Sequence, residues 1–205
     1  MLDLNYISYY EKINNRNKIH FIKGLIPRFI NYYKSQIICS IAKLKGAKIG
    51  SNSYITLKLA LKANNNLTIG NSSIIESHDL DLRDRIFIGN KVIINKGVKI
   101  LRASHIVDSS FFETISNELI VEDFVWIATS AVVLPSCKII KEGSVIGASS
   151  VLAYSIKEPK SIVFGNPAVF KRYRKENYIN LIVESLQGRD LKQYLNSKKI
   201  NIKQD

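Results

Sequence analysis

The chain has 205 residues, of which 46% are apolar and 23% are charged, a composition typical of one soluble domain with a substantial core. No run of about 18 apolar residues indicates a membrane span. The net charge of +13 favours anionic partners such as phosphates, acidic polysaccharide or an anionic membrane face. We do not expect nucleic acid, because the basic residues are scattered and no binding motif accompanies them. A coding bias toward Lys, Asn and Ile would explain the same surplus without any partner.

The first 20 residues lack the charged and then apolar architecture of a signal peptide, so we expect a cytoplasmic protein. The two cysteines, Cys39 and Cys137, are too few for a disulfide framework. The three histidines lie far apart in the sequence, and none has another beside it with which to bind zinc. We therefore expect no metal site.

The first predicted element is a helix over residues 24–46, which ends at Gly46. Its apolar face is formed by residues spaced three or four apart, namely Ile26, Ile30, Tyr33, Ile37, Ile41 and Leu44. Basic residues occupy its other faces, namely Arg28, Lys34, Lys43 and Lys45. The helix either caps the open end of the structure that follows or rests as a basic amphipathic helix on the inner membrane surface.

A period of six residues begins after this helix, which is neither the 3.6 of a helix nor the 2 of a strand. The aliphatic positions, with two slips, are Ile49, Ile55, Leu61, Ile69, Ile75, Leu82, Ile88, Ile94 and Ile100. An interruption follows from about residue 101 to residue 120. The period then resumes at Val121, Ile127, Val133, Ile139, Val145 and Val151.

A second position supports this register, because a small or β-branched residue often follows four residues after the aliphatic one. In the later units these residues are Val125, Ala131, Cys137, Gly143, Ser149 and Ser155. We expect both positions to point inward, the small one because a second large side chain would overpack the interior. Glycines after the aliphatic residue, at Gly50, Gly70 and Gly89, would suit tight corners.

This pattern resembles the hexapeptide repeat of left-handed parallel β-helices, in which three units close one triangular coil. Fifteen units predict a mainly β fold of about five coils, and the resemblance supplies the left hand. The alternative is a parallel sheet in some other repeat fold. We divide the chain into an N-terminal helical segment (1–46), the β-helix (47–156) with a protruding loop (105–120), and a C-terminal part (157–205).

The C-terminal part begins with a tight loop over residues 165–168, followed by a basic cluster. The cluster consists of Lys171, Arg172, Arg174 and Lys175. Residues 176–195 are predicted to form a helix, with Gly188 a candidate break.

Five segments together resemble the hexapeptide-repeat acetyltransferases that use acetyl-CoA. They are "KGAKIG" (45–50), "SH" (104–105), "VWIATSAVVLPS" (125–136), "SVIGASSV" (144–151) and "FGNPAVFKR" (164–172). The likeness covers roughly residues 40–175 and is closest to O-acetyltransferases of exopolysaccharide and capsule assembly, of the colanic-acid type. It departs from the usual pattern at Ile140, where glycine is common, and in a corner that is one residue longer.

His105 is the candidate general base, because it lies where the protruding loop leaves the coils and imidazole accepts protons near neutral pH. It would take the proton of an acceptor hydroxyl and pass it to the CoA thiolate. Asp108 could orient its ring, although only proximity supports this. His20 and His78 are expected to be ordinary exposed residues.

Two further residues are expected at the acceptor side of the site. Asp79 falls on the predicted inward small position, and the resemblance places an acceptor-contacting polar residue near it. The alternative is a carboxylate that caps backbone amides. Trp126 should point outward, because its neighbour Ile127 points inward. The resemblance places it beside the acetyl and pantetheine groups, and the alternative is burial at a subunit interface alone.

The resemblance also implies the residues on the coenzyme side. Small residues at Ala128, Gly147 and Ala148 would let pantetheine approach the coil edge, and the Ala128 amide is a candidate for holding the thioester oxyanion. Lys160, Lys171 and Arg172 would bind the nucleotide phosphates. For such a basic cluster, the alternative is a solvated surface.

Together these features imply an acetyl-CoA-dependent O-acetyltransferase that modifies a sugar of a bacterial surface polysaccharide. The resemblance implies a homotrimer with active sites between neighbouring subunits, and peripheral contact with the inner membrane would fit a lipid-linked acceptor. Two alternatives are an acetyltransferase for an amino sugar or antibiotic, and a non-catalytic β-helix scaffold.

Overall fold

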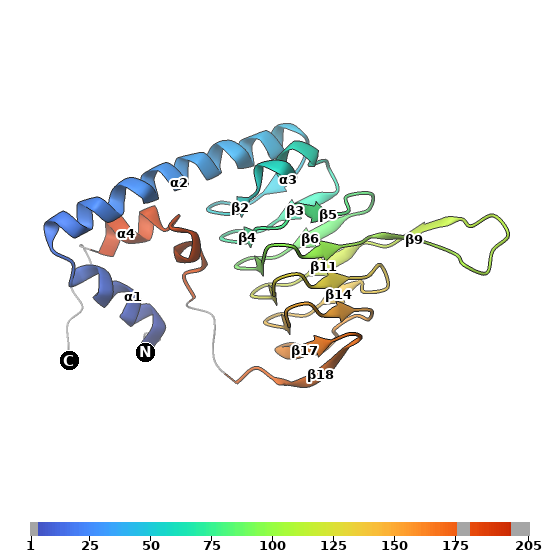
Figure 1. Ribbon diagram of the computed structural model, residues 1–205. Coiled ribbons are helices and arrows are strands. Elements are labelled where there is room, and N and C mark those ends of the chain that lie inside the picture. The colour runs from blue at the N-terminus through green and yellow to red at the C-terminus, as the bar shows by residue number, and fades with distance from the viewer. Residues whose placement is uncertain (1–3, 176–180, 198–205) are drawn as a thin grey trace.

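The structure is a computed structural model that describes residues 4–175 and 181–197. Most of it is a three-sided prism of parallel β-strands, with helices at one end and a long hairpin that projects from one edge (Figure 1). The predicted parallel β-helix with flanking helices is therefore confirmed. The coils number about six rather than five.

The strands form three faces, and each coil between the two ends of the prism contributes one strand to each face in turn. Face 1 contains β1 (Lys48–Ile49), β3 (Leu67–Ile69), β6 (Ile86–Ile88), β11 (Leu119–Val121) and β14 (Ile139–Ile140). Face 2 contains β2 (Tyr54–Ile55), β4 (Ile74–Ile75), β7 (Ile93–Ile94), β12 (Trp126–Ile127), β15 (Val145–Ile146), β17 (Ser161–Gly165) and the antiparallel β18 (Ala168–Tyr173). Face 3 contains β5 (Asp79–Leu80), β8 (Lys99–Ile100), β13 (Val132–Val133) and β16 (Val151–Leu152).

The sixth coil was missed because both ends of the prism depart from the repeat. In the first coil, the third side is a short helix, α3 (Leu57–Lys62), whose Leu61 is exposed rather than inside. The last coil has only a single bridge, from Ile156 to Ile140, on face 1 before β17 closes it on face 2. The hexapeptide pattern is weak at both ends, because fewer neighbouring strands cover them.

The interior register slips by one residue after Val133. Val121, Ile127 and Val133 are buried as predicted, but their partners in the next coil are Ile140, Ile146 and Leu152. The prediction that Ile139, Val145 and Val151 point inward is therefore wrong, and these three side chains lie half-buried on the outer surface. The physical reason is the extra residue in the corner after Val133, which shifts every later side chain to the opposite side of its strand.

The same slip corrects the last three predicted small inward positions, since Ile156 and not Ser155 is buried in the interior. Ser144 and Ser150 are buried in the interior, whereas Gly143 and Ser149 lie one residue earlier at the corners. Both corner residues have positive φ, 67° and 55°, which is the left-handed region that glycine adopts most readily. The glycine at 143 therefore serves the turn and not the packing of the interior.

Hydrogen bonds between coils hold the corner that joins face 1 to face 2. Asn71 Oδ1 accepts from the Ser51 amide, Asn90 Oδ1 from the Asn71 amide and Asp123 Oδ1 from the Asn90 amide, at 2.8, 2.8 and 2.7 Å. Gly50, Gly70 and Gly89 lie beside these hydrogen bonds, one in each of three successive coils, and together form a glycine column. A Cβ atom on Gly70 would lie 2.7 Å from the backbone of the next coil, so no side chain fits there.

The longest helix, α2 (Lys18–Leu44), begins six residues before the predicted start, because Asn17 caps it by accepting a hydrogen bond from the His20 amide. It lies across the end of the prism beside α3 (Figure 1). The side chains that it buries there are Ser35, Ile38, Cys39 and Ala42. The helix therefore caps the prism, but not with the apolar face that the sequence predicted.

The C-terminal segment returns to the N-terminal helices. It consists of the 3₁₀ helix η1 (Val183–Gln187) and α4 (Leu191–Ser197), which are separated at Gly188. Residues 176–180 of the helix predicted at 176–195 lie outside the described residues. Arg28 of α2 forms an ion pair with the buried Asp190 at 2.9 Å, and α1 (Leu4–Asn14) lies against α4 (Figure 1). Among the described residues, no helix is long and apolar enough to cross a membrane.

The glycine column yields a prediction about stability. Gly70→Ala should lower the free energy of unfolding by about 1–3 kcal/mol, because its new methyl group meets backbone atoms that cannot move separately. Thermal unfolding followed by circular dichroism measures this as a drop of several degrees in Tm.

Glu122 occupies the equivalent position in a later coil, follows Val121 directly and already carries a side chain. Glu122→Ala is therefore the matched control. It loses a partly exposed ion pair with Lys141 and a hydrogen bond from the Glu142 amide, so it should lower Tm less than Gly70→Ala does. Equal shifts for the two variants would contradict the close-approach explanation.

Candidate active site

The interruption of the repeat is an antiparallel hairpin. Its strands are β9 (Ala103–His105) and β10 (Thr114–Ser116), which pair from Ala103 with Ser116 to His105 with Thr114. The hairpin extends away from the prism (Figure 1). Its tip carries large exposed apolar side chains, among them Phe111 at 86% and Val107 at 75%. Exposed apolar groups gathered on a projecting element are typical of an interaction surface.

A fully buried guanidinium, that of Arg102, anchors the base of the hairpin. Its Nη1 donates to the carbonyl oxygens of Asn117, Glu118 and Cys137 at 3.3, 3.3 and 2.8 Å, and its Nη2 donates to that of Leu134 at 2.6 Å. Two of these carbonyls belong to the chain as it re-enters the prism. The other two belong to the corner with the extra residue. Sequence reasoning missed Arg102, although an arginine two residues after the inward Ile100 was a visible signal.

Asp81 holds the other side of the hairpin base. Its Oδ2 accepts hydrogen bonds from the backbone amides of Arg102 and Ala103 at 3.1 and 3.3 Å. The Arg83 guanidinium beside it holds the pKa of the Asp81 carboxyl well below its usual range. Asp81 therefore stays ionised and fixes the direction in which β9 leaves face 3. Sequence reasoning missed this residue as well.

His105 lies exposed on the hairpin with its ring orientation fixed. Its Nδ1 is 2.9 Å from the carbonyl oxygen of Phe112, and its ring stacks on the Phe112 ring at a centroid distance of 5.0 Å. A carbonyl only accepts, so Nδ1 must carry the proton. In the neutral imidazole, Nε2 is then the unprotonated nitrogen, which is the form that a general base requires. Phe112, rather than Asp108, orients the ring.

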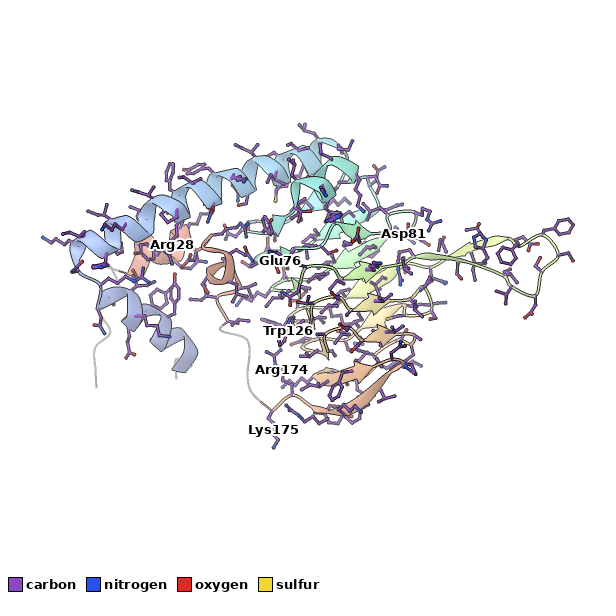
Figure 2. The ribbon with its side chains drawn as sticks, viewed as in Figure 1. Arg28, Glu76, Asp81, Trp126, Arg174 and Lys175 are labelled. Carbon is purple, nitrogen blue, oxygen red and sulfur yellow. The ribbon has the colours of Figure 1, made fainter. Side chains whose placement is uncertain are left out.

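Trp126 points outward from face 2 as predicted and is 42% exposed. Its indole Nε1 donates to Asn95 Oδ1 at 2.7 Å, and Asn95 Nδ2 donates to Glu76 Oε2 at 3.1 Å. Glu76 also accepts a hydrogen bond from Gln187 of the C-terminal segment. This chain of polar contacts along face 2 holds the indole ring in one orientation. Figure 2 shows Glu76 and Trp126 along this face.

A cavity of about 380 Å³ opens beside Trp126. Its floor is the outer surface of face 2, and its other wall is the C-terminal segment. The lining side chains include Ile93, Asn95, Phe124, Leu181 and Leu186, with Lys91 and Arg174 at its polar edge. Its size and largely apolar lining suit part of a small ligand. The sequence gave no sign that residues near 186 would close it.

The corner between face 2 and face 3 carries the predicted coenzyme-side residues, and it corrects one of them. The Ala128 amide donates to the Ile146 carbonyl at 2.9 Å, so it is used by the coil and cannot hold an oxyanion. Thr129 follows it, and Ala148 lies above Thr129 in the next coil. Both are exposed, and within the described residues no acceptor is found for either amide.

Gly147 and the basic residues lie beyond this corner. A Cβ atom on Gly147 would lie 2.5 Å from Cβ of Phe164, so glycine is needed for coil packing. Lys171 on β18 lies over the Phe164 ring with its Nζ 4.7 Å from the ring centroid. Arg172 Nη1 donates to the Tyr173 carbonyl at 3.2 Å, and Lys160 occupies a corner with φ of 59°. Lys160, Lys171 and Arg172 are all exposed in the last coil and the strand that follows it.

Asp79 does not occupy the inward position that was predicted. Ser77 fills it instead, and its hydroxyl donates to the Val98 carbonyl at 2.5 Å. Asp79 lies on the outer surface of face 3, where its carboxylate is 3.5 Å from His78 Nε2. The reason is that strand β5 places Leu80 inside, so its neighbour points out.

The described chain does not bring His105 and the coenzyme-side corner together. The hairpin that carries His105 begins at the edge where face 3 meets face 1. Thr129 and Ala148 lie at the edge where face 2 meets face 3. Among the described residues, no group of histidine, cysteine and acidic side chains could hold a metal. Burial raises the pKa of the Cys137 thiol to about 11, so this cysteine is not a nucleophile.

The geometry can be compared with known proteins. The sequence matches no protein-family profile. It is 30% identical over 138 residues to WcaF of Escherichia coli (strain K12), to which an acetyltransferase role in colanic acid biosynthesis is provisionally assigned. The match spans 66% of this chain and 74% of WcaF. This chain belongs to the hexapeptide-repeat acetyltransferases.

Two galactoside acetyltransferases are also similar to this chain. A galactoside O-acetyltransferase of Lactococcus lactis subsp. lactis (strain IL1403) is 30% identical over 120 residues, which are 57% of this chain and 51% of that protein. The chain thus spans about half the length of that relative. The structure of a galactoside acetyltransferase in complex with coenzyme A superposes with a TM-score of 0.54 at 17% identity. It covers 78% of this chain and 84% of that one, and this likeness concerns the fold alone.

The hydrogen bonds of Arg102 predict how this acetyltransferase responds to its loss. Arg102→Met should lower the free energy of unfolding by about 3 kcal/mol or more, because several buried carbonyls lose their donor and each unsatisfied group costs about 1–3 kcal/mol. Urea denaturation measures this as a lower midpoint.

Arg102→Lys keeps the charge but not the forked donor, so its loss should be intermediate. Limited proteolysis should cut the hairpin of Arg102→Met faster than that of the unsubstituted protein. A wild-type midpoint and a wild-type cleavage rate for Arg102→Met would refute the anchoring role.

Proposed function

We propose that the chain transfers an acetyl group from acetyl-CoA to a sugar hydroxyl of a bacterial surface polysaccharide or its precursor. The observation that carries this proposal is the state of His105. Its Nδ1 is bound to the Phe112 carbonyl, and its Nε2 has no hydrogen-bond partner in the part of the chain that the structure describes. The names of WcaF and the galactoside O-acetyltransferase support a saccharide acceptor.

The reaction follows from that tautomer. Nε2 of His105 takes the proton of the acceptor hydroxyl as its oxygen attacks the thioester carbonyl. The tetrahedral intermediate then collapses, the carbon–sulfur bond breaks, and the proton passes from Nε2 to the departing thiolate. The products are an acetyl ester and free CoA. Since the transfer is direct, no covalent enzyme intermediate and no metal are needed.

The coenzyme would lie along the corner between faces 2 and 3. The exposed amides of Thr129 and Ala148 replace the Ala128 amide as candidates for holding the thioester oxyanion. Pantetheine would pass beside Gly147, and Trp126 would cover its acetyl end. Lys160, Lys171 and Arg172 would contact the nucleotide phosphates as charged donors. Asp79, exposed on face 3, is the proposed acceptor contact.

A site that uses both His105 and this corner requires a second copy of the chain. We propose a homotrimer, in which the hairpin of one subunit lies against the corner of the next. Two features support it: the hairpin projects away from its own prism, and its tip is apolar and exposed. A cyclic trimer with this heterologous contact would close on itself and form three equivalent sites.

The role of His105 has a direct test. His105→Ala should reduce kcat for acetyl transfer to a saccharide acceptor by about 10²–10⁴-fold, because it removes the base and leaves the fold unchanged. CoA release, followed with a thiol reagent, measures the rate. The matched control is His20→Ala, an exposed histidine on α2 outside the proposed site, which should keep its activity.

Coenzyme binding should persist in His105→Ala. CoA at about 100 times its Kd should stabilise this variant and the unsubstituted protein by about 2.7 kcal/mol each, seen as a higher Tm. Near-full turnover by His105→Ala would contradict the assignment. The absence of any CoA effect on the unsubstituted protein would instead support a scaffold without catalysis.

The shared site is tested by mixing two inactive variants. Ala148→Trp, which blocks the coenzyme edge, is coexpressed with His105→Ala in equal amounts. If each site takes His105 from one subunit and the corner from the next, random mixed trimers should recover about one quarter of the wild-type activity. Each variant alone is the control. A mixture as inactive as its components, at a mass that confirms mixed trimers, would show that the site lies within one subunit.

A further inference from the structure

The positive charge is concentrated at the capped end of the prism. Between Glu11 and Glu76 the chain has eleven basic residues and no acidic one. The rest of the chain therefore has 19 of the 30 basic residues and all 17 acidic ones, which nearly cancel. The first segment comprises α2, α3 and the first coil, so almost the entire surplus lies at one end of the molecule. A general coding bias would not produce such a distribution.

The same end exposes an apolar stripe along the whole of α2. Its residues are exposed between 50% and 89%, and they are Ile19, Ile22, Ile26, Phe29, Ile30, Tyr33, Ile37 and Leu44. At 3.6 residues per turn, they fall within about 60° of one line along the helix. The residues that α2 buries against the prism lie on the opposite side. The stripe therefore points away from the molecule, and it is about 40 Å long at 1.5 Å per residue.

Basic residues border this stripe on both sides. Lys23 and Lys34 lie about 60–80° to one side of its centre line, and Lys18 and Lys43 lie about 80–100° to the other. All four are exposed. Arg28 alone lies on the opposite face, where it pairs with Asp190. Lysines in such border positions can bury their aliphatic parts and keep their ammonium groups in water at the level of lipid phosphates.

We propose that α2 binds in the plane of an anionic lipid bilayer, with its stripe in the acyl region and its lysines at the headgroups. An apolar face bordered by lysines and free of acids is the chemistry of an interfacial helix. A soluble polyanion would use the lysines but leave the stripe in water. A second copy would cover the stripe but bring two sets of lysines together. This inference goes beyond the proposed acetyl transfer and does not rest on it.

Vesicle sedimentation tests the proposal with the full-length protein. Vesicles of phosphatidylcholine with about 30% phosphatidylglycerol should bind it, and vesicles of phosphatidylcholine alone should bind it much less. Lys23→Gln combined with Lys34→Gln should weaken binding to the anionic vesicles about 30-fold, at about 1 kcal/mol per lysine and 1.4 kcal/mol per factor of ten. Ile26→Gln combined with Ile30→Gln should weaken binding at least tenfold at unchanged charge.

Matched controls exist elsewhere on the chain. Lys138→Gln with Lys157→Gln removes the same charge from the exposed far end of the prism, and Val169→Gln with Phe170→Gln removes two exposed apolar groups from β18. Both pairs should bind anionic vesicles as the unsubstituted protein does. Circular dichroism checks that every variant is folded.

Three results would overturn the proposal. The first is no sedimentation with anionic vesicles. The second is equal losses in the control pairs, which would mean that net charge or exposed apolar surface in general is responsible. The third is a change in mass by light scattering for Ile26→Gln with Ile30→Gln in the absence of lipid, which would make the stripe an interface between copies. Binding to heparin without binding to vesicles would count against it as well. None of these results bears on CoA binding, which is measured separately.

Discussion

Every coil of this protein must place aliphatic side chains at the same three interior positions as the coil before it. Parallel backbone hydrogen bonds between coils enforce this alignment. A shift of one residue would move the interior side chains of a strand to its outer surface. The constraint explains why the interior is a column of Ile, Leu and Val, and why extra residues occur only at corners. It also explains the glycine column, where backbones approach too closely for a side chain. The rigid prism then provides fixed edges on which a site can be built.

The hairpin shows how an insertion satisfies this constraint. The chain leaves after Ile100 on face 3 and returns at Leu119, which pairs with Ile86 as though nothing had been inserted. Arg102 makes this possible, because its guanidinium supplies donors to carbonyls that have left the regular ladder. Where the chain leaves face 3, the Asp81 carboxylate accepts hydrogen bonds from the backbone amides of Arg102 and Ala103. The position of His105 thus depends on one buried cation and one anion, both outside the repeat pattern.

The repeat, the helix that precedes it and the interruption were all predictable from the sequence, because the period of six is set by local packing. The register after Val133 was not, since Ile139 and Ile140 are equally apolar and only the pairing with Val121 separates them. Whether the apolar face of α2 is covered by the prism was left open for a related reason. Periodicity identifies an apolar stripe but does not show whether protein covers it. Arg102, Asp81 and the wall formed by Leu186 depend on contacts between distant residues, which no local pattern contains.

The C-terminal segment touches two parts of the molecule that otherwise lie apart. Its Asp190 is bound by Arg28 of α2, and its Leu186 forms a wall of the cavity beside Trp126. Gln187 links the two, because Asn31 of α2 donates to its carbonyl while its own amide contacts Glu76. Asp190, Gln187 and Leu186 therefore join α2, face 2 and the cavity wall through one short stretch of chain. The cavity beside the indole ring is thus built from parts of the sequence as far apart as Lys91 and Leu186.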